Sequence, residues 1–206
     1  MSFSPSQPSP AGPLSRTTLV IGLYGAMAIV ALLIGAGRGN PDIFRIGEAP
    51  SWLLLGGPAI GAGVGLGMVG LTRVATRQFQ WAKDLHASFR DLLGPLTGRE
   101  IVILALASSI GEELLFRGAL LPWLGLVIQA AVFALLHVGP GKRFLPWTLS
   151  AFVLGAGFGA LAQVTGNLGA PIAAHFMINF LNLRFIVRTP VSALVATVQV
   201  VPSTAV

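Results

Sequence analysis

The chain has no cysteine and few charged residues: charged residues make up 10% of its 206 residues, and seven residues are acidic. Without cysteine it can form neither a disulfide nor a thiolate metal site. Soluble domains carry about 25% charged residues, so this shortage argues against a soluble protein. Hydrophobic residues make up 54% of the chain, and the mean hydropathy is +0.80. This composition indicates a polytopic membrane protein.

The net charge of +6 raises the possibility of nucleic-acid binding. The basic residues are instead spread singly between apolar segments, which favours a role in membrane orientation and argues against a nucleic-acid partner. With the N-terminus in the cytoplasm, ten basic residues fall on inner segments, and the outer ones hold Arg38 and Arg45. The positive-inside rule therefore predicts a multi-pass protein of the bacterial inner membrane with both termini cytoplasmic.

Apolar runs predict an all-α fold with about six membrane spans and one interfacial helix. The amphipathic stretch between Arg73 and Glu100 has apolar residues at helical spacing and predicts that interfacial helix; they are Trp81, Leu85, Phe89, Leu92 and Leu93. The expected spans are 18–37, 52–71, 101–122, 123–138, 145–164 and 170–187.

The same pattern predicts four regions along the chain. Residues 1–17 form a disordered cytoplasmic tail, and 18–99 hold two membrane helices with the amphipathic connector. Residues 100–188 form a catalytic core, and 189–206 form a C-terminal tail. The apolar run 191–201 is too short to cross a hydrocarbon core of about 30 Å as a helix, and its insertion in the membrane stays open.

Glycines recur at four-residue spacing in two of the expected spans. Gly57, Gly61 and Gly65 form one series, and Gly155 and Gly159 form another. A phosphate-binding loop would need a preceding strand and a following Lys-Ser or Lys-Thr, and neither is present. We therefore interpret both series as faces for close helix packing.

Ionisable residues lie within the apolar second half, where each charge costs roughly 2.5–3.5 kcal/mol to insert. Glu112, Glu113 and Arg117 share one expected helix, His137 ends the next, and His175 lies one turn before Asn179 on the last; His86, in the polar connector, is expected to be solvated. Glu113 and Arg117 are four residues apart and can pair. Glu112 is rotated by about 100° from Glu113 and can face another partner.

These groups suit the hydrolysis of a peptide bond. A carboxylate and an imidazole can hold and deprotonate a water, while a second imidazole and an amide donate hydrogen bonds to an oxyanion. One Glu and two His also form a known ligand set for catalytic zinc. Taken singly, each residue has a structural alternative, such as an interhelical hydrogen bond. A non-proteolytic scaffold or immunity protein and a small proton or ion transporter are the alternative functions.

Three ordered motifs resemble those of the CAAX-protease and bacteriocin-processing (CPBP) family. They are Glu112-Glu113-x-x-x-Arg117, Phe133-x-x-x-His137 and His175-x-x-x-Asn179, and the resemblance covers about residues 100–183. It includes Gly155 to Gly159 and the turn at Thr165-Gly166-Asn167-Leu168. The family contains the type II CAAX prenyl endopeptidases and many bacterial intramembrane proteases.

The resemblance implies an all-α intramembrane endopeptidase that acts on a membrane-anchored protein or peptide. By the family pattern, Glu112 and His137 activate the water, and His175 with Asn179 forms the oxyanion hole. Glu113, Arg117 and Phe133 are the supporting residues. The cofactor is left open between zinc, held by Glu112, His137 and His175, and a metal-free glutamate mechanism.

The expected substrate is a C-terminal segment of a membrane-anchored protein, removed as in the sorting peptidases of the myxosortase type. Eleven arginines against two lysines favour a bacterial origin, so a prenylated substrate is not expected.

The predicted topology leaves one conflict. Both histidine-bearing helices run from outside to inside, yet His137 ends its helix and His175 lies near the start of its own. Two arrangements resolve this: the helix before His137 ends deep within the protein and residues 139–146 line a cavity, or the last helix begins elsewhere. The family resemblance favours the first.

Overall fold

The computed structural model describes residues 15–196, and these are helical with no β-strand. The predicted tails fall largely outside this range, at residues 1–14 and 197–206, although the first helix already begins at Arg16. In chain order the elements are α1 (Arg16–Gly37), α2 (Trp52–Gln78), α3 (Gln80–Leu93), α4 (Gly98–Glu113), the π-helix η1 (Leu114–Leu120), α5 (Leu121–Leu135), the 3-10 helix η2 (Lys142–Phe144), α6 (Leu145–Thr165), α7 (Gly169–Arg188) and α8 (Val191–Ala196).

Five segments among the described residues are long and apolar enough to cross a membrane, which confirms an all-α polytopic membrane protein. The count is five and not six, because residues 98–135 form one helical segment of 38 residues. A straight helix of that length would measure about 57 Å, almost twice the hydrocarbon core. The segment is instead broken at Gly125, whose φ of 77° is left-handed.

The predicted break at Pro122 is therefore three residues early. Pro122 lies in the first turn of α5, where its missing N–H costs no helical hydrogen bond. Gly125 provides the break because a residue without Cβ adopts a positive φ at little cost.

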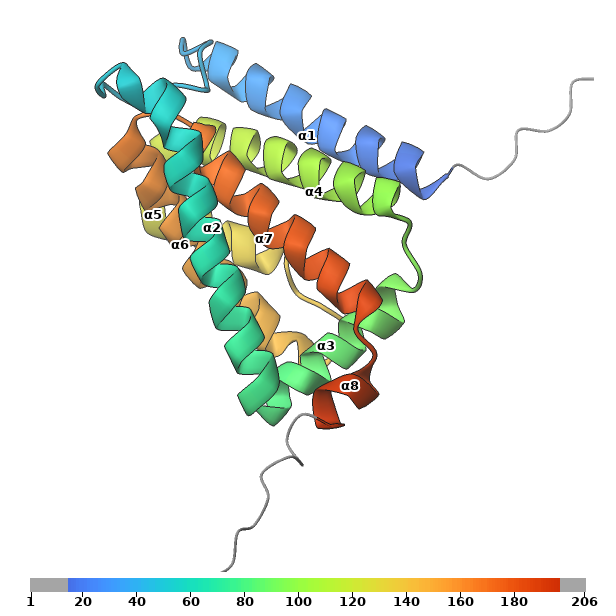
Figure 1. The fold of residues 1–206 in the computed structure, drawn as a ribbon. Helices are drawn as coiled ribbons and strands as arrows, with labels where there is room; N and C mark the ends of the chain where they lie inside the picture. The colour runs from blue at the N-terminus through green and yellow to red at the C-terminus, as the bar shows by residue number, and fades with distance from the viewer. Residues whose placement is uncertain (1–14, 197–206) are drawn as a thin grey trace, which may run out of the picture.

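The helices pack in pairs. Helix α1 lies along α4, α2 along α7, and α5 along α6 (Figure 1). Helix α3 lies across the end of the bundle where α2 and α7 finish (Figure 1). Many large apolar side chains of α1 and α2 face outward, as expected for helices surrounded by lipid.

The glycine series provide the close packing that their spacing predicts. A Cβ on Gly61 would collide with the Ala170 carbonyl, and one on Gly65 would lie 2.7 Å from the carbonyl oxygen of Ala174. On α6, a Cβ on Gly155 would lie 3.3 Å from Cα of Ala130. Both series therefore allow the backbones of neighbouring helices to approach closely: the series on α2 packs against α7, and the series on α6 packs against α5.

Helix α3 has an outward apolar edge, where Trp81 and Leu92 are about half exposed. Its other face holds the C-terminal end of α7. His86 Nε2 donates to the Thr189 carbonyl at 2.9 Å, and Arg90 Nη1 donates to the carbonyls of Ile186 and Val187 at 2.8 and 2.6 Å. The prediction of a solvated His86 is wrong, because the terminal carbonyls of a helix need donors and α3 supplies them.

We expect Gly61→Ala to destabilise the protein by about 1–3 kcal/mol, the usual cost of overpacking, because the new methyl group meets the backbone of α7. The matched control is Gly63→Ala, since a Cβ at Gly63 has no atom within 4 Å. Thermal unfolding of the purified protein, followed by circular dichroism, measures both. Equal melting temperatures for the two variants would contradict the packing of α2 on α7.

Stability should fall as the pH is lowered below about 6.5, the ordinary pKa of histidine. Burial lowers the pKa of His86, and the neighbouring Arg90 and Arg73 lower it further, against the opposite effect of the bond to Thr189. The unfolded chain therefore binds this proton more readily than the folded one, and protonation favours unfolding. Melting temperatures of wild type and His86→Gln between pH 7.5 and 5 test this. The wild type should lose more stability over that range, and parallel curves would contradict the assignment.

Candidate active site

The two glutamates lie at the end of α4, immediately before the helix widens into the π-helix η1. Helix α4 begins with a capping box, in which Thr97 and Glu100 satisfy each other's backbone donors. Glu112 and Glu113 are both buried, and Arg117 lies within η1. Short π-helices inside α-helices often occur at functional sites. The cluster of Glu112, Glu113 and Arg117 therefore lies where the α-helix changes to a π-helix.

The buried Glu113 carboxylate has two charged or polar partners, one on its own helical segment and one on α7. Its Oε1 accepts from Arg117 Nη1 at 2.8 Å and from His175 Nδ1 at 2.7 Å. The predicted pairing of Glu113 with Arg117 is present, and the bond to His175 adds a link from α4 to α7. Glu113 therefore orients an imidazole as well as neutralising Arg117.

Arg117 is fully buried, and the helices α5 and α6 complete its surroundings. Its Nη2 donates to the Gly155 carbonyl at 3.2 Å, and its guanidinium carbon lies 4.4 Å from the centre of the Phe133 ring. Gln129, also fully buried, donates to the same Gly155 carbonyl at 3.0 Å. Phe133 thus contacts Arg117, and its supporting role stays a prediction.

Glu112 faces both histidines. Its Oε2 lies 3.7 Å from His137 Nε2 and 3.8 Å from His175 Nε2. This oxygen is buried and accepts no hydrogen bond from the described residues. Both separations are too long for a direct hydrogen bond and are of the kind that a bridging water fills.

The other ring nitrogen of each histidine has a partner. His137 Nδ1 lies 2.7 Å from the Phe133 carbonyl, which can only accept, so Nδ1 carries a proton. His175 Nδ1 faces the carboxylate of Glu113 in the same way. When neutral, each ring therefore presents an unprotonated Nε2 towards Glu112.

The two histidines meet at Glu112 although α5 ends at the protein surface, where Leu135 and Leu136 are exposed; the cavity lined by residues 139–146 stays a prediction. Helix α5 finishes at Leu135, and residues 136–141 leave it without helical structure. Thr148 Oγ1, on α6, donates to the His137 carbonyl at 2.8 Å and holds this short segment in place. His137 thereby lies beside Glu112, as does His175 in the second turn of α7.

Asn179 lies on the same helix as His175 but contacts a residue that the motifs do not include. Its Nδ2 donates to Ser108 Oγ at 2.9 Å. Ser108 lies one helical turn before Glu112, so its position on the glutamate face of α4 could have indicated it. The motifs did not indicate Gln129 either, although a lone carboxamide within an apolar run could have marked it as a buried polar residue.

Glu112, His137 and His175 supply donor atoms of the types that zinc binds, but not its spacing. Two ligands held 2.0–2.1 Å from a tetrahedral zinc lie about 3.3 Å apart, less than the two separations measured here. No group of three His, Cys, Asp or Glu residues between residues 15 and 196 is arranged to hold a metal ion. The residues as they stand therefore do not form a metal site.

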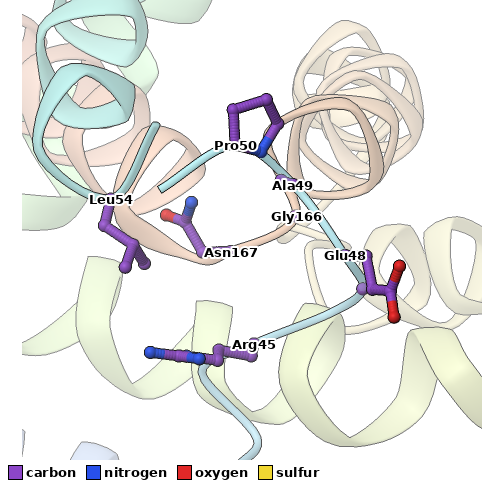
Figure 2. A pocket seen from close by; sticks show the side chains of 8 residues that line it. Arg45, Glu48, Ala49, Pro50, Leu54, Gly166 and Asn167 are labelled. Atoms are coloured by element: carbon purple, nitrogen blue, oxygen red, sulfur yellow. The ribbon is translucent and has the colours of Figure 1, made fainter. Parts of the chain in front are cut away.

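A separate cavity of about 500 Å³ lies between the α1–α2 connection and the α6–α7 turn (Figure 2). Asn167 borders it, but its amide already donates to the carbonyls of Leu53 and Thr165 at 3.3 and 2.7 Å. None of the residues that line this cavity belongs to the polar cluster; they are Arg45, Gly47, Glu48, Ala49, Pro50, Leu54, Gly166 and Asn167. Asn167 therefore serves to anchor the start of α7 on α2.

We expect Arg117→Ala to lower protein stability by roughly 3–5 kcal/mol, because the buried Glu113 loses the cation that neutralises it. The matched control is Arg184→Ala, since Arg184 is exposed on α7. The abundance of each variant in membranes, measured by immunoblot at equal messenger level, tests this. Wild-type abundance of Arg117→Ala would contradict the network.

The polar cluster lies within the part of the chain that resembles known proteins. Residues 97–181 match the family described as type II CAAX prenyl endopeptidase Rce1-like. The chain is also 39% identical over 82 residues to an uncharacterized protein, YpbD, of Bacillus subtilis, covering 38% of this chain and 41% of that relative. Comparison with solved structures gave no match. The matched residues 97–181 hold all three motifs, so the match confirms the resemblance that the motifs predicted.

Proposed function

We propose that this protein is an intramembrane endopeptidase, in which Glu112 activates a water molecule. The observation that carries the proposal is the buried Oε2 of Glu112, which lacks a hydrogen bond from the described residues and lies 3.7 and 3.8 Å from two imidazole Nε2 atoms. A water at this point can donate one hydrogen to the Glu112 carboxylate and the other to an imidazole Nε2. The match of residues 97–181 to an endopeptidase family supports this proposal.

In the proposed reaction, Glu112 accepts a proton from the water while the water oxygen attacks the peptide carbonyl carbon. A carbon–oxygen bond forms, and the carbonyl electron pair moves to the oxygen to give an oxyanion. The carbon–nitrogen bond then breaks, and the proton held by Glu112 passes to the leaving amine. His137 orients the water through its Nε2, since its Nδ1 donates to the Phe133 carbonyl.

Asn179 and His175 stabilise the oxyanion in this proposal. The Asn179 amide has two N–H groups, and Ser108 takes one of them, so the other can reach a substrate oxygen. His175 donates from Nε2 only when its ring is doubly protonated, because Nδ1 donates to Glu113. Glu113 fixes the orientation of the His175 ring through Nδ1, which makes Glu113 a positioning residue in this proposal.

The proposed substrate is a peptide bond in a membrane-anchored protein, cleaved when a C-terminal anchor or sorting segment is removed. The glutamates lie on segment 98–135 and His175 on segment 169–188, which are both long and apolar enough to cross a membrane, and His137 follows the first of them directly. A scissile bond reaches such a site only as part of a chain that itself enters the bilayer.

We also propose that the end of the bundle with α3 faces the cytoplasm of a bacterial cell. Basic residues gather on α3 and on the adjoining ends of α2, α4 and α7, whereas the α1–α2 connection carries only Arg38 and Arg45. This asymmetry supports cytoplasmic termini by the positive-inside rule.

The test compares the membrane proteins of cells that carry wild type, Glu112→Gln or His137→Ala in place of the chromosomal copy. Both variants should lose at least about 100-fold in processing rate, the usual contribution of general base catalysis, and a membrane protein should then keep an additional anchor. Mass spectrometry of protein termini identifies the membrane protein that keeps this anchor. Glu48→Gln is the matched control, because Glu48 is exposed and lies outside the cluster.

Normal processing by either variant at equal abundance would contradict the proposal. A scaffold or immunity protein would keep its phenotype in both variants, and a transporter would change ion flux in vesicles without peptide cleavage.

A further inference from the structure

Ser108 lies on α4, four residues before Glu112 and therefore on the same face of that helix. It is buried, with 3% of the residue exposed, and none of the three motifs includes it. A hydroxyl that is removed from water needs hydrogen-bond partners inside the protein. The partners of Ser108 lie on α4 itself and on α7.

These two partners fix the direction of each hydrogen bond. Ser108 Oγ lies 3.3 Å from the Ala105 carbonyl, which can only accept, so the single hydroxyl hydrogen points to that carbonyl. The lone pairs of Oγ are then free to accept from Asn179 Nδ2, which lies 2.9 Å away on α7. The nitrogen of the Asn179 carboxamide, and not its oxygen, therefore faces α4.

This contact lies one helical turn from the proposed water site. Ser108 and Glu112 are four residues apart on α4, and His175 and Asn179 are four residues apart on α7. The bond between Ser108 and Asn179 is therefore the neighbour of the approach between Glu112 and His175. Because Ser108 holds one N–H of Asn179, the amide plane is fixed and the second N–H keeps one direction.

We propose that Ser108 is a positioning residue, whose hydroxyl fixes the Asn179 amide so that its free N–H points to the substrate carbonyl oxygen. This inference rests on the proposed function, in which Asn179 stabilises the oxyanion. It adds the residue that keeps this donor in place before the substrate binds. A donor held in this way stabilises the oxyanion more effectively, because it needs no reorientation during the reaction.

The contact can be tested without any substrate, by nuclear magnetic resonance of protein labelled with ¹⁵N at asparagine alone. The chain has four asparagines, which are Asn40, Asn167, Asn179 and Asn182. The spectrum therefore contains four side-chain amide pairs, and Asn179→Ala identifies the pair of interest. Ser108→Ala should shift that pair, because one of its protons loses its acceptor.

The matched control is Ser109→Ala. Ser109 is also buried on α4, and its Oγ donates to the Leu106 carbonyl at 3.1 Å, as Ser108 does to Ala105. Both variants thus remove a buried hydroxyl that bonds the carbonyl three residues earlier. Ser109→Ala should leave the Asn179 amide signals unchanged.

A second measurement follows catalysis, on the membrane protein that accumulates with Glu112→Gln. Its processing rate, measured by pulse–chase, should fall at least about tenfold in Ser108→Ala, because loss of an oxyanion donor costs roughly 10²–10³ in rate and an unsupported donor turns away for much of the time. Ser109→Ala should process at the wild-type rate. In Asn179→Ala, adding Ser108→Ala should cause no further loss, since the positioned residue is already absent. A purely structural hydroxyl would instead add its own loss and lower the melting temperature.

If Ser108→Ala fails to accumulate, the wild-type protein supplies the test: the Asn179 amide protons should show a nuclear Overhauser contact with the β-protons of Ser108. Absence of that contact, unchanged Asn179 signals in Ser108→Ala, or a wild-type processing rate in that variant would overturn the inference. Absence of any Glu112-dependent processing would instead refute the proposed function, and the spectra would still decide whether Ser108 holds the amide.

Discussion

The carboxylate of Glu113 is the centre on which the rest of this structure depends. It accepts from Arg117 on its own helical segment and from His175 on α7. Both its side chain and that of Arg117 are fully buried, where an unpaired charge would cost several kcal/mol. The pair therefore forms only because α5 and α6 surround it with aromatic rings and the Gly155 carbonyl. The buried charges are therefore neutralised only when the helices of the bundle pack together.

The two glycine series determine how closely the apolar surfaces of the helices pack. Gly61 and Gly65 allow α7 to lie directly on α2, and this contact sets the depth of His175. Gly155 and Gly159 allow α6 to approach α5, so that Gly155 presents its carbonyl to Arg117. Close packing of small residues thus places the polar groups, and the polar groups in turn prevent the helices from sliding.

Much of the candidate site could be predicted from the chain. The spacing of Glu113 and Arg117 predicted their pairing, which the structure contains. The four-residue glycine series predicted helix contacts, and these are also present. His86 could not be predicted correctly, because its partner is a backbone carbonyl at Thr189, which no side-chain pattern marks.

The sequence by itself determined that the protein is an all-α membrane protein with a polar cluster on three of its helical segments, because hydropathy and helical spacing are local properties. The tertiary structure decided where the long third segment breaks and how His137 reaches His175, since both depend on Gly125 and on α5 ending at Leu135. It also decided that Glu113 binds His175 and that Ser108 and Gln129 lie beside the cluster. Those contacts join residues far apart in the chain, and only the packing of whole helices brings them together.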